Sequence, residues 1–137
     1  MIRLPLLRPL AYPVAMANIR LGSIALDCAD PGQLSTFWAE LLGGEVAFSN
    51  EDFAAVKIDR MWLAATRVEA HAAPTWPEGP VPKQVHLDLA VDDLDLAEER
   101  ATSLGAVRAE TQPAPDRYLV LIDPGGHPFC LSTQIPD

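Results

Sequence analysis

The sequence predicts an α+β fold built from two βαβββ modules, and three observations lead to this prediction. Residues 21–46 and 84–107 share one pattern, in which an alternating apolar strand is followed by an aspartate and by a helix that ends at glycine. Residues 54–66 and 117–133 share a second pattern, in which an Ile-Asp turn joins two strands. A short apolar stretch separates the two patterns in each half of the chain. The sequence therefore indicates a duplication of one unit.

The first module is expected to contain a helix that starts after Asp30. This residue is a good N-cap, and Pro31 suits the first helical position. Apolar residues then recur at three- and four-residue spacing, which predicts one buried stripe: Leu34, Phe37, Trp38, Leu41 and Leu42. Gly43 and Gly44 are expected to end the helix, because glycine adopts the left-handed conformation readily.

The second module repeats these elements with a longer hairpin turn. Asp92 or Asp93 is expected to cap its helix, and Gly105 is expected to end it. The helix carries an apolar stripe formed by Leu94, Ala97, Ala101 and Leu104. In the DPGGHP turn, we expect Asp123 to accept hydrogen bonds from the glycine amides. The imidazole of His127 is expected to cap the same turn, against Asp123.

These patterns divide the chain into four segments that together form one domain. Residues 1–19 are expected to be a mobile extension and residues 20–69 the first module. A proline-rich linker over 70–83 leads to the second module, residues 84–134.

Composition excludes several classes of partner. The net charge of −9 opposes binding to nucleic acid and to anionic membranes. No apolar run reaches the roughly 18 residues of a membrane-spanning helix. We expect the two cysteines, Cys28 and Cys130, to be reduced and buried, as in a cytoplasmic protein.

Four segments in this order resemble the vicinal oxygen chelate superfamily, and within it the glyoxalase-like and bleomycin-resistance-like proteins. The segments are the paired modules themselves, FWAELLGGE, VHLDLAVDDLDLAEERATSLGA and LIDPGGHPFCL, and the resemblance covers roughly residues 20–134. The resemblance implies the glyoxalase/bleomycin resistance/dioxygenase-like fold, with sheets curled around a cavity. It also implies that such chains often pair as homodimers.

Enzymes of the superfamily bind a divalent metal through four side chains, which are His, Gln or Glu and lie on the first and last strands of the two modules. Transferred to this chain, the first-strand positions fall on Ser23 and His86. The last-strand positions fall on or near Leu63 and on Cys130, with equivalent residues of the two hairpins 67 positions apart. Only His86 matches the pattern. We therefore expect no four-ligand metal site and no cofactor; if a divalent metal does bind, His86 and Cys130 are its expected ligands.

Five residues are candidates to line a ligand-binding cavity: Ser23, Trp62, His86, Asp88 and Cys130. His86 and Asp88 alternate along one strand face, so both can point into the cavity, although we expect this spacing to be too long for a reliable hydrogen bond. His86 can instead be a partly buried residue satisfied by a neighbouring group, and Cys130 an inert core thiol. Trp76, in the linker, can cover a pocket.

The favoured function is the binding of a small organic molecule between the modules, by shape and charge and without bond making. The alternative is a metal-dependent lyase, isomerase or dioxygenase with an altered site that uses His86. A third hypothesis is a vestigial site in a protein that acts through its dimer surface.

Overall fold

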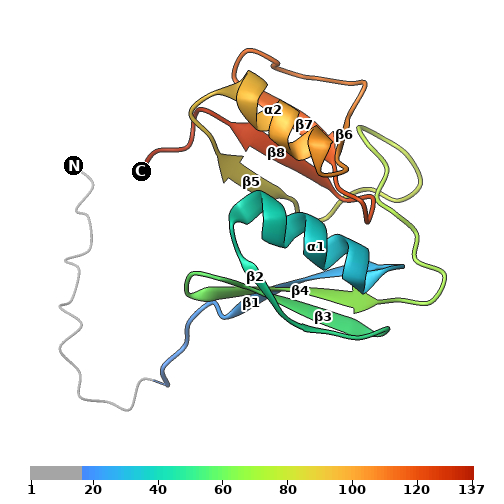
Figure 1. The fold of residues 1–137 in the computed structure, drawn as a ribbon. Helices are drawn as coiled ribbons and strands as arrows, with labels where there is room; N and C mark the ends of the chain where they lie inside the picture. Colours follow the sequence, from blue (N-terminus) through green and yellow to red (C-terminus); the bar gives the residue numbers. More distant parts are fainter. Residues whose placement is uncertain (1–16) are drawn as a thin grey trace, which may run out of the picture.

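The computed structural model of the chain describes residues 17–137 (Figure 1). Residues 1–16, most of the expected N-terminal extension, lie outside the described residues. Residues 17–22 form no regular secondary structure and lead into the first strand.

The first module forms a four-stranded sheet, called sheet 1, with the strand order β1-β4-β3-β2. Strand β1 runs parallel to β4, and the other neighbouring strands are antiparallel. The elements are β1 (Ser23–Cys28), α1 (Pro31–Leu42), β2 (Glu45–Ser49), β3 (Phe53–Ile58) and β4 (Met61–Arg67).

The second module repeats this topology in sheet 2, with the strand order β5-β8-β7-β6 and β5 parallel to β8. Its elements are β5 (Leu87–Ala90), α2 (Leu94–Ser103), β6 (Val107–Arg108), β7 (Tyr118–Ile122) and β8 (Pro128–Ser132). The predicted α+β fold of two βαβββ modules is therefore confirmed.

The helix ends follow the residues that the sequence indicated. The Asp30 carboxylate accepts a hydrogen bond from the Gln33 amide at 3.1 Å, and Asp93 accepts one from the Leu96 amide at 3.0 Å. Asp93, rather than Asp92, is thus the N-cap of α2. Gly43 ends α1 with a φ of 67°, the left-handed conformation that glycine adopts at little cost.

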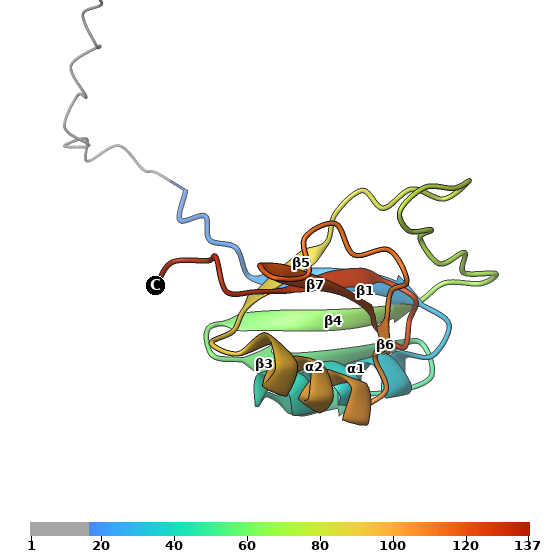
Figure 2. The same cartoon turned by 90° about the horizontal axis from the view of Figure 1, so that it is seen from above.

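Each sheet has one face that packs against a helix and one open face on its other side. Helix α1 lies against sheet 1 and α2 against sheet 2 (Figure 1), and both helices lie on the same side of the molecule (Figure 2). The helix-facing side chains of both sheets join one hydrophobic core. The two sheets are not closed over one another within the chain, so their open faces carry the side chains that remain free for binding.

Helix α1 joins the modules, because its buried stripe also packs against β8. The ring centroid of Phe129 lies 5.0 Å from that of Trp38 and 5.9 Å from that of Phe37. The Trp38 indole donates a hydrogen bond to the buried Asp123 carboxylate at 3.0 Å. Trp38 is completely buried, as expected for a core residue.

The DPGGHP turn lies at this junction. The Asp123 carboxylate accepts hydrogen bonds from the amides of Gly125 and His127, both at 2.9 Å, so its predicted role in the turn is confirmed. The expectation for the His127 imidazole was wrong. Its Nε2 lies 2.6 Å from the Asp27 carbonyl oxygen of β1, because the turn carries the ring across to the first module.

Among residues 17–137, no helix combines the length and the apolar character needed to cross a bilayer.

Candidate functional site

The open faces hold the positions that the resemblance marks as metal ligands. Aligning the modules on their N-caps, Asp30 and Asp93, makes Ser23 the counterpart of His86. In the parallel ladders, Ala25 pairs with Ala64 as Asp88 pairs with Cys130.

The counterpart of Cys130 is therefore Ala64, one position after the Leu63 on or near which it was expected. Leu63 belongs to the helix-facing core, since a shift of one residue along a strand moves a side chain to the other face. Neither side chain can bind a metal.

His86, Asp88 and Cys130 form a cluster on the open face of sheet 2. Asp88 and Cys130 are direct neighbours in the β5–β8 ladder, and His86 precedes Asp88 by two residues on the same face. The Nε2 atom of His86 lies 3.1 Å from Asp88 Oδ1, so the two side chains form the hydrogen bond that the sequence spacing made us doubt. One ligand atom of each of the three residues lies within 4.8 Å of the others.

The cluster joins a buried thiol to exposed polar groups. Cys130 is 8% exposed, whereas the side chains of His86 and Asp88 are 34% and 50% exposed. The pKa of the Cys130 thiol is raised to about 11. Burial is the largest cause, and the charge and hydrogen bond of Asp88 contribute to the same rise. The thiol is therefore protonated at neutral pH and is a weak nucleophile.

A shallow pocket of 250 Å³ opens beside this cluster. It is lined by all three cluster residues and by a rim of mixed polarity: Tyr118, Ser132, Gln134 and Ile135. The sequence prediction included none of these rim residues. The alternation of β7 could have indicated Tyr118, which pairs with Ser132 across the ladder, but Gln134 and Ile135 follow the last strand and have no periodicity to place them.

The other two predicted lining residues lie on the open face of sheet 1. Ser23 pairs with Trp62, and the Lys57 amine lies 4.7 Å from the centre of the Trp62 ring. This face also carries the exposed aromatic residues Phe48 and Phe53. Neither Ser23 nor Trp62 lines the pocket around His86, so a single chain does not bring all five predicted residues together.

Trp76 of the linker covers another part of sheet 2. Its ring packs against the cluster of Ala109, Val120 and Cys130, and its indole donates a hydrogen bond to the Thr111 carbonyl at 3.1 Å. The amine of Lys83 lies 4.7 Å from the centre of the same ring. The linker thus packs beside the cluster, although Trp76 does not line the pocket at His86.

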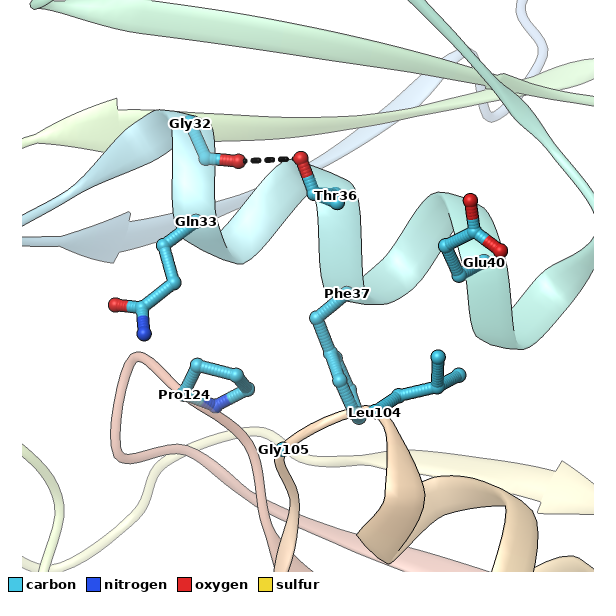
Figure 3. Close-up of a pocket in the computed structure, with 8 residues that line it drawn as sticks. All are labelled: Gly32, Gln33, Thr36, Phe37, Glu40, Leu104, Gly105 and Pro124. Atoms are coloured by element: carbon cyan, nitrogen blue, oxygen red, sulfur yellow. Dashed lines mark hydrogen bonds between the residues drawn. The ribbon is translucent and has the colours of Figure 1, made fainter.

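A separate cleft of 390 Å³ lies on the helix side of the molecule, between α1 and the end of α2 (Figure 3). Phe37 and Leu104 form its apolar part, and the Thr36 hydroxyl is occupied by a hydrogen bond to the Gly32 carbonyl at 2.8 Å. The cleft gathers no group of titratable donors comparable to the cluster on sheet 2.

The donor set does not fit the four-ligand metal site of the superfamily. Ala64 has no donor atom, and Ser23 is a poor ligand while its hydroxyl is protonated. The other two marked positions, His86 and Cys130, lie in the second module and offer one nitrogen and one sulfur. The pattern of four hard or borderline donors drawn from both modules is therefore broken.

Comparisons with known proteins agree with the fold. The family described as Glyoxalase-like domain matches residues 23–132, which include both modules. No curated protein sequence matches the chain.

Several solved structures share the architecture. The fosfomycin resistance protein FosX from Listeria monocytogenes, solved with Mn(II) and 1S,2S-dihydroxypropylphosphonic acid, is 18% identical with a TM-score of 0.64, over 85% of this chain and 90% of that one. A possible glyoxalase from Bacillus cereus is 14% identical with a TM-score of 0.62, over 84% and 99% of the two chains. The oxidase ChaP-H2 is 21% identical with a TM-score of 0.60, over 85% and 94%. At these identities the likeness shows the fold alone.

Proposed function

We propose, from the premise that the chain belongs to the glyoxalase-like domain family, that it binds a small organic molecule on the open face of its sheets without the four-ligand metal site of the superfamily. The observation that carries this proposal is the pocket beside His86, Asp88 and Cys130. Polar groups beside an apolar wall are the usual composition of small-molecule sites.

The mechanism is binding by complementarity. The Asp88 carboxylate accepts hydrogen bonds from a donor group of the ligand, and His86, hydrogen-bonded to Asp88, adds a second polar contact. Tyr118 supplies aromatic surface. The protonated Cys130 thiol forms no covalent bond, because its pKa of about 11 leaves little thiolate at neutral pH.

A homodimer is part of this proposal. The pocket of one chain is shallow, and the open face of sheet 1 exposes Phe48 and Phe53 with exposed fractions of 51% and 37%. A second copy that laid this face over the cluster would bring Ser23 and Trp62 to the ligand and would cover the exposed aromatic rings. Light scattering tests this arrangement, since a monomer at working concentrations would contradict it.

We place the protein in the cytoplasm. Both Cys28 and Cys130 are free thiols, which is the usual state in a reducing compartment.

The test is a thermal-shift screen of small aromatic and amphipathic compounds against protein treated with a chelator. A compound present at a hundred times its dissociation constant adds about 2.7 kcal/mol of apparent stability. Binding that survives the chelator supports the proposal, whereas a broad library that produces no shift would contradict it.

The matched variants are His86→Ala and His71→Ala. His71 lies outside the pocket, where its imidazole Nε2 is 3.1 Å from the Gly125 carbonyl oxygen. We expect His86→Ala to weaken binding while the far-ultraviolet circular dichroism is unchanged, and His71→Ala to retain binding. Unfolding of His86→Ala would instead assign His86 to the structure of the strand.

A metal-dependent lyase, isomerase or dioxygenase with an altered site is the second candidate. The three donors within 4.8 Å of one another favour it. Ligand binding or turnover that disappears with the chelator and returns with a divalent metal would establish this candidate in place of the first.

A further inference from the structure

The open face of sheet 2 carries an apolar patch that a side chain of the linker covers. Val120 and Cys130 are partners in the β7–β8 ladder, so their side chains share this face, and Ala109 belongs to the same cluster. Their exposed fractions are only 1%, 8% and 8%, although the helices lie on the opposite side of the sheets (Figure 2). The ring of Trp76 packs against the three residues. A loop, rather than a second layer of the fold, therefore closes this apolar patch.

The floor of the apolar patch is held in place without the help of Trp76. The Gln112 side chain donates hydrogen bonds to the carbonyl oxygens of Ala109 and Val120, at 2.8 and 2.7 Å. It also accepts one from the Val120 amide at 2.8 Å. These bonds fasten the segment after β6 to β7. If the Trp76 ring moved away, a formed surface would remain.

Trp76 is held over the apolar patch by contacts that another ring can replace. Its indole N–H donates to the Thr111 carbonyl at 3.1 Å in a solvent-exposed bond, and the Lys83 amine lies 4.7 Å from the ring centre. An exposed hydrogen bond changes an equilibrium constant roughly 2- to 13-fold, and an exposed cation–π contact roughly 2- to 5-fold. Trp76 lies in a small loop closed by two hydrogen bonds from Thr75 to the Val81 carbonyl, at 2.6 and 3.0 Å. The loop can therefore move as a unit.

The contacts of Trp76 describe the ligand that can take its place. The apolar floor accepts a flat ring, the Thr111 carbonyl accepts a hydrogen bond from the edge of that ring, and the Lys83 amine favours an electron-rich ring face. We propose that the apolar patch is a subsite for a planar, electron-rich aromatic ring with an N–H or O–H group on its edge. Trp76 occupies this subsite in the free protein, and the ligand displaces it.

This inference rests on the proposed function, for which it names the ligand class and the way the site opens. The apolar patch adjoins the 250 Å³ pocket, because Cys130 and Tyr118 border both. Cys130 is also the ladder partner of Asp88. A ligand that places its ring on the apolar patch can therefore reach the Asp88 carboxylate with a polar substituent.

The first experiment adds indole to the full-length, nitrogen-15-labelled protein and follows the side-chain N–H signals of its three tryptophans. We expect the Trp76 signal to shift, because its bond to Thr111 is lost, and the signal of the buried Trp38 to stay in place. Nuclear Overhauser effects should join indole protons to the methyl groups of Val120 and Ala109. A Trp76 signal that does not move, or indole that contacts neither methyl group, would overturn the proposal.

A matched pair of variants tests the displacement. Trp76→Ala should bind indole about 3- to 10-fold more tightly, since the apparent dissociation constant falls as the fraction of open sites rises. Glu78→Ala changes an exposed residue of the same loop and should bind indole as the wild type does. Equal or weaker binding by Trp76→Ala would contradict a competing ring. The indole contacts in the wild-type protein decide the question if Trp76→Ala does not fold.

The donor on the ring edge is tested with 1-methylindole, which has the same flat ring without the N–H group. It should bind Trp76→Ala roughly 2- to 13-fold more weakly than indole does, because the Thr111 carbonyl loses its partner. Equal affinities would contradict the assigned role of this carbonyl.

The subsite and the proposed function can fail separately. A compound from the thermal-shift screen that shifts the signals of His86 and Asp88 but leaves that of Trp76 in place would retain the proposed function and overturn the subsite. A screen without any hit, together with indole that contacts neither Val120 nor Ala109, would overturn both.

Discussion

The two modules share one backbone plan but carry different chemistry on their open faces. The face of sheet 1 presents Ser23 and Ala64 at the marked positions, beside the aromatic ring of Trp62. The equivalent face of sheet 2 presents His86 and Cys130, with Asp88 between them. The helix-facing sides, in contrast, are apolar in both modules and meet in one core.

This difference separates what the fold requires from what it leaves free. Side chains that face the helices are constrained by packing, because interiors are close-packed and a lost methylene is costly. Side chains that stay exposed on an open face stabilise the module little, so the two copies can differ at those positions without loss of the fold. The first module therefore supplies an aromatic wall, and the second supplies the polar donors.

The largest effect on stability is expected from substitutions in the helix-facing core that the two modules share. Phe129 of β8 and its counterpart Leu63 of β4 are both buried in the common core. We expect Phe129→Ala to cost about 3–5 kcal/mol and Leu63→Ala about 2–5 kcal/mol in the free energy of unfolding. Denaturant unfolding should remain a single transition in both variants, since a module that melted alone would contradict a shared core.

The next effect concerns the hydrogen bond that links α1 to the second module. Trp38→Phe removes the donor to Asp123 and leaves one oxygen of a buried carboxylate without this partner. Such a loss costs about 1–3 kcal/mol, to which the smaller ring adds a packing loss. Urea unfolding measures the change, and a variant as stable as the wild type would show that the junction does not depend on this bond.

A smaller effect concerns the Cys130 thiol. Its pKa of about 11 lies above the ordinary value of 9.0, so the protonated thiol stabilises the fold at lower pH, and this contribution is lost as the pH rises from about 9 to 11. Asp88→Asn should lower the pKa but leave it above 9.0, because burial is the larger cause. The carbon-13 shift of labelled cysteine in a Cys28→Ser background reports this titration. An unchanged pKa would mean that Asp88 does not act on the thiol.

The smallest effect is expected in the first module. Ser23 is exposed on the open face, so Ser23→Ala should change the free energy of unfolding by less than about 0.5 kcal/mol. It should weaken ligand binding less than His86→Ala does. A larger loss in Ser23→Ala would reverse the contrast between the two faces.

The parts of the molecule that repeat were the parts that the sequence predicted well. Both helices begin at their aspartate caps, and the apolar stripe of α1 is buried at Leu34, Phe37 and Trp38. Helix periodicity and capping depend on a few residues that are neighbours in the sequence, so they can be recognised from the sequence alone.

The errors arose where residues distant in sequence meet. The sequence alignment of the two hairpins is one position out of register, because their turns differ in length. This shift makes Leu63, rather than Ala64, the counterpart of Cys130. The Asp123–Trp38 bond spans 85 positions, and the contact of His127 with Asp27 spans 100. The five candidate residues lie on open faces, but their division between two sheets required the structure; that they line a ligand site stays a prediction.

The claim at the centre of this account is that the open face of sheet 2 binds the ligand without the four-ligand metal site. The most direct measurement is amide chemical-shift mapping of the chelator-treated protein with a compound from the thermal-shift screen. We expect the largest shifts at His86, Asp88 and Cys130, and smaller ones at Trp62 of the covering copy. Shifts concentrated at Phe37 and Leu104 in the helix-side cleft, or binding that requires added metal, would contradict it.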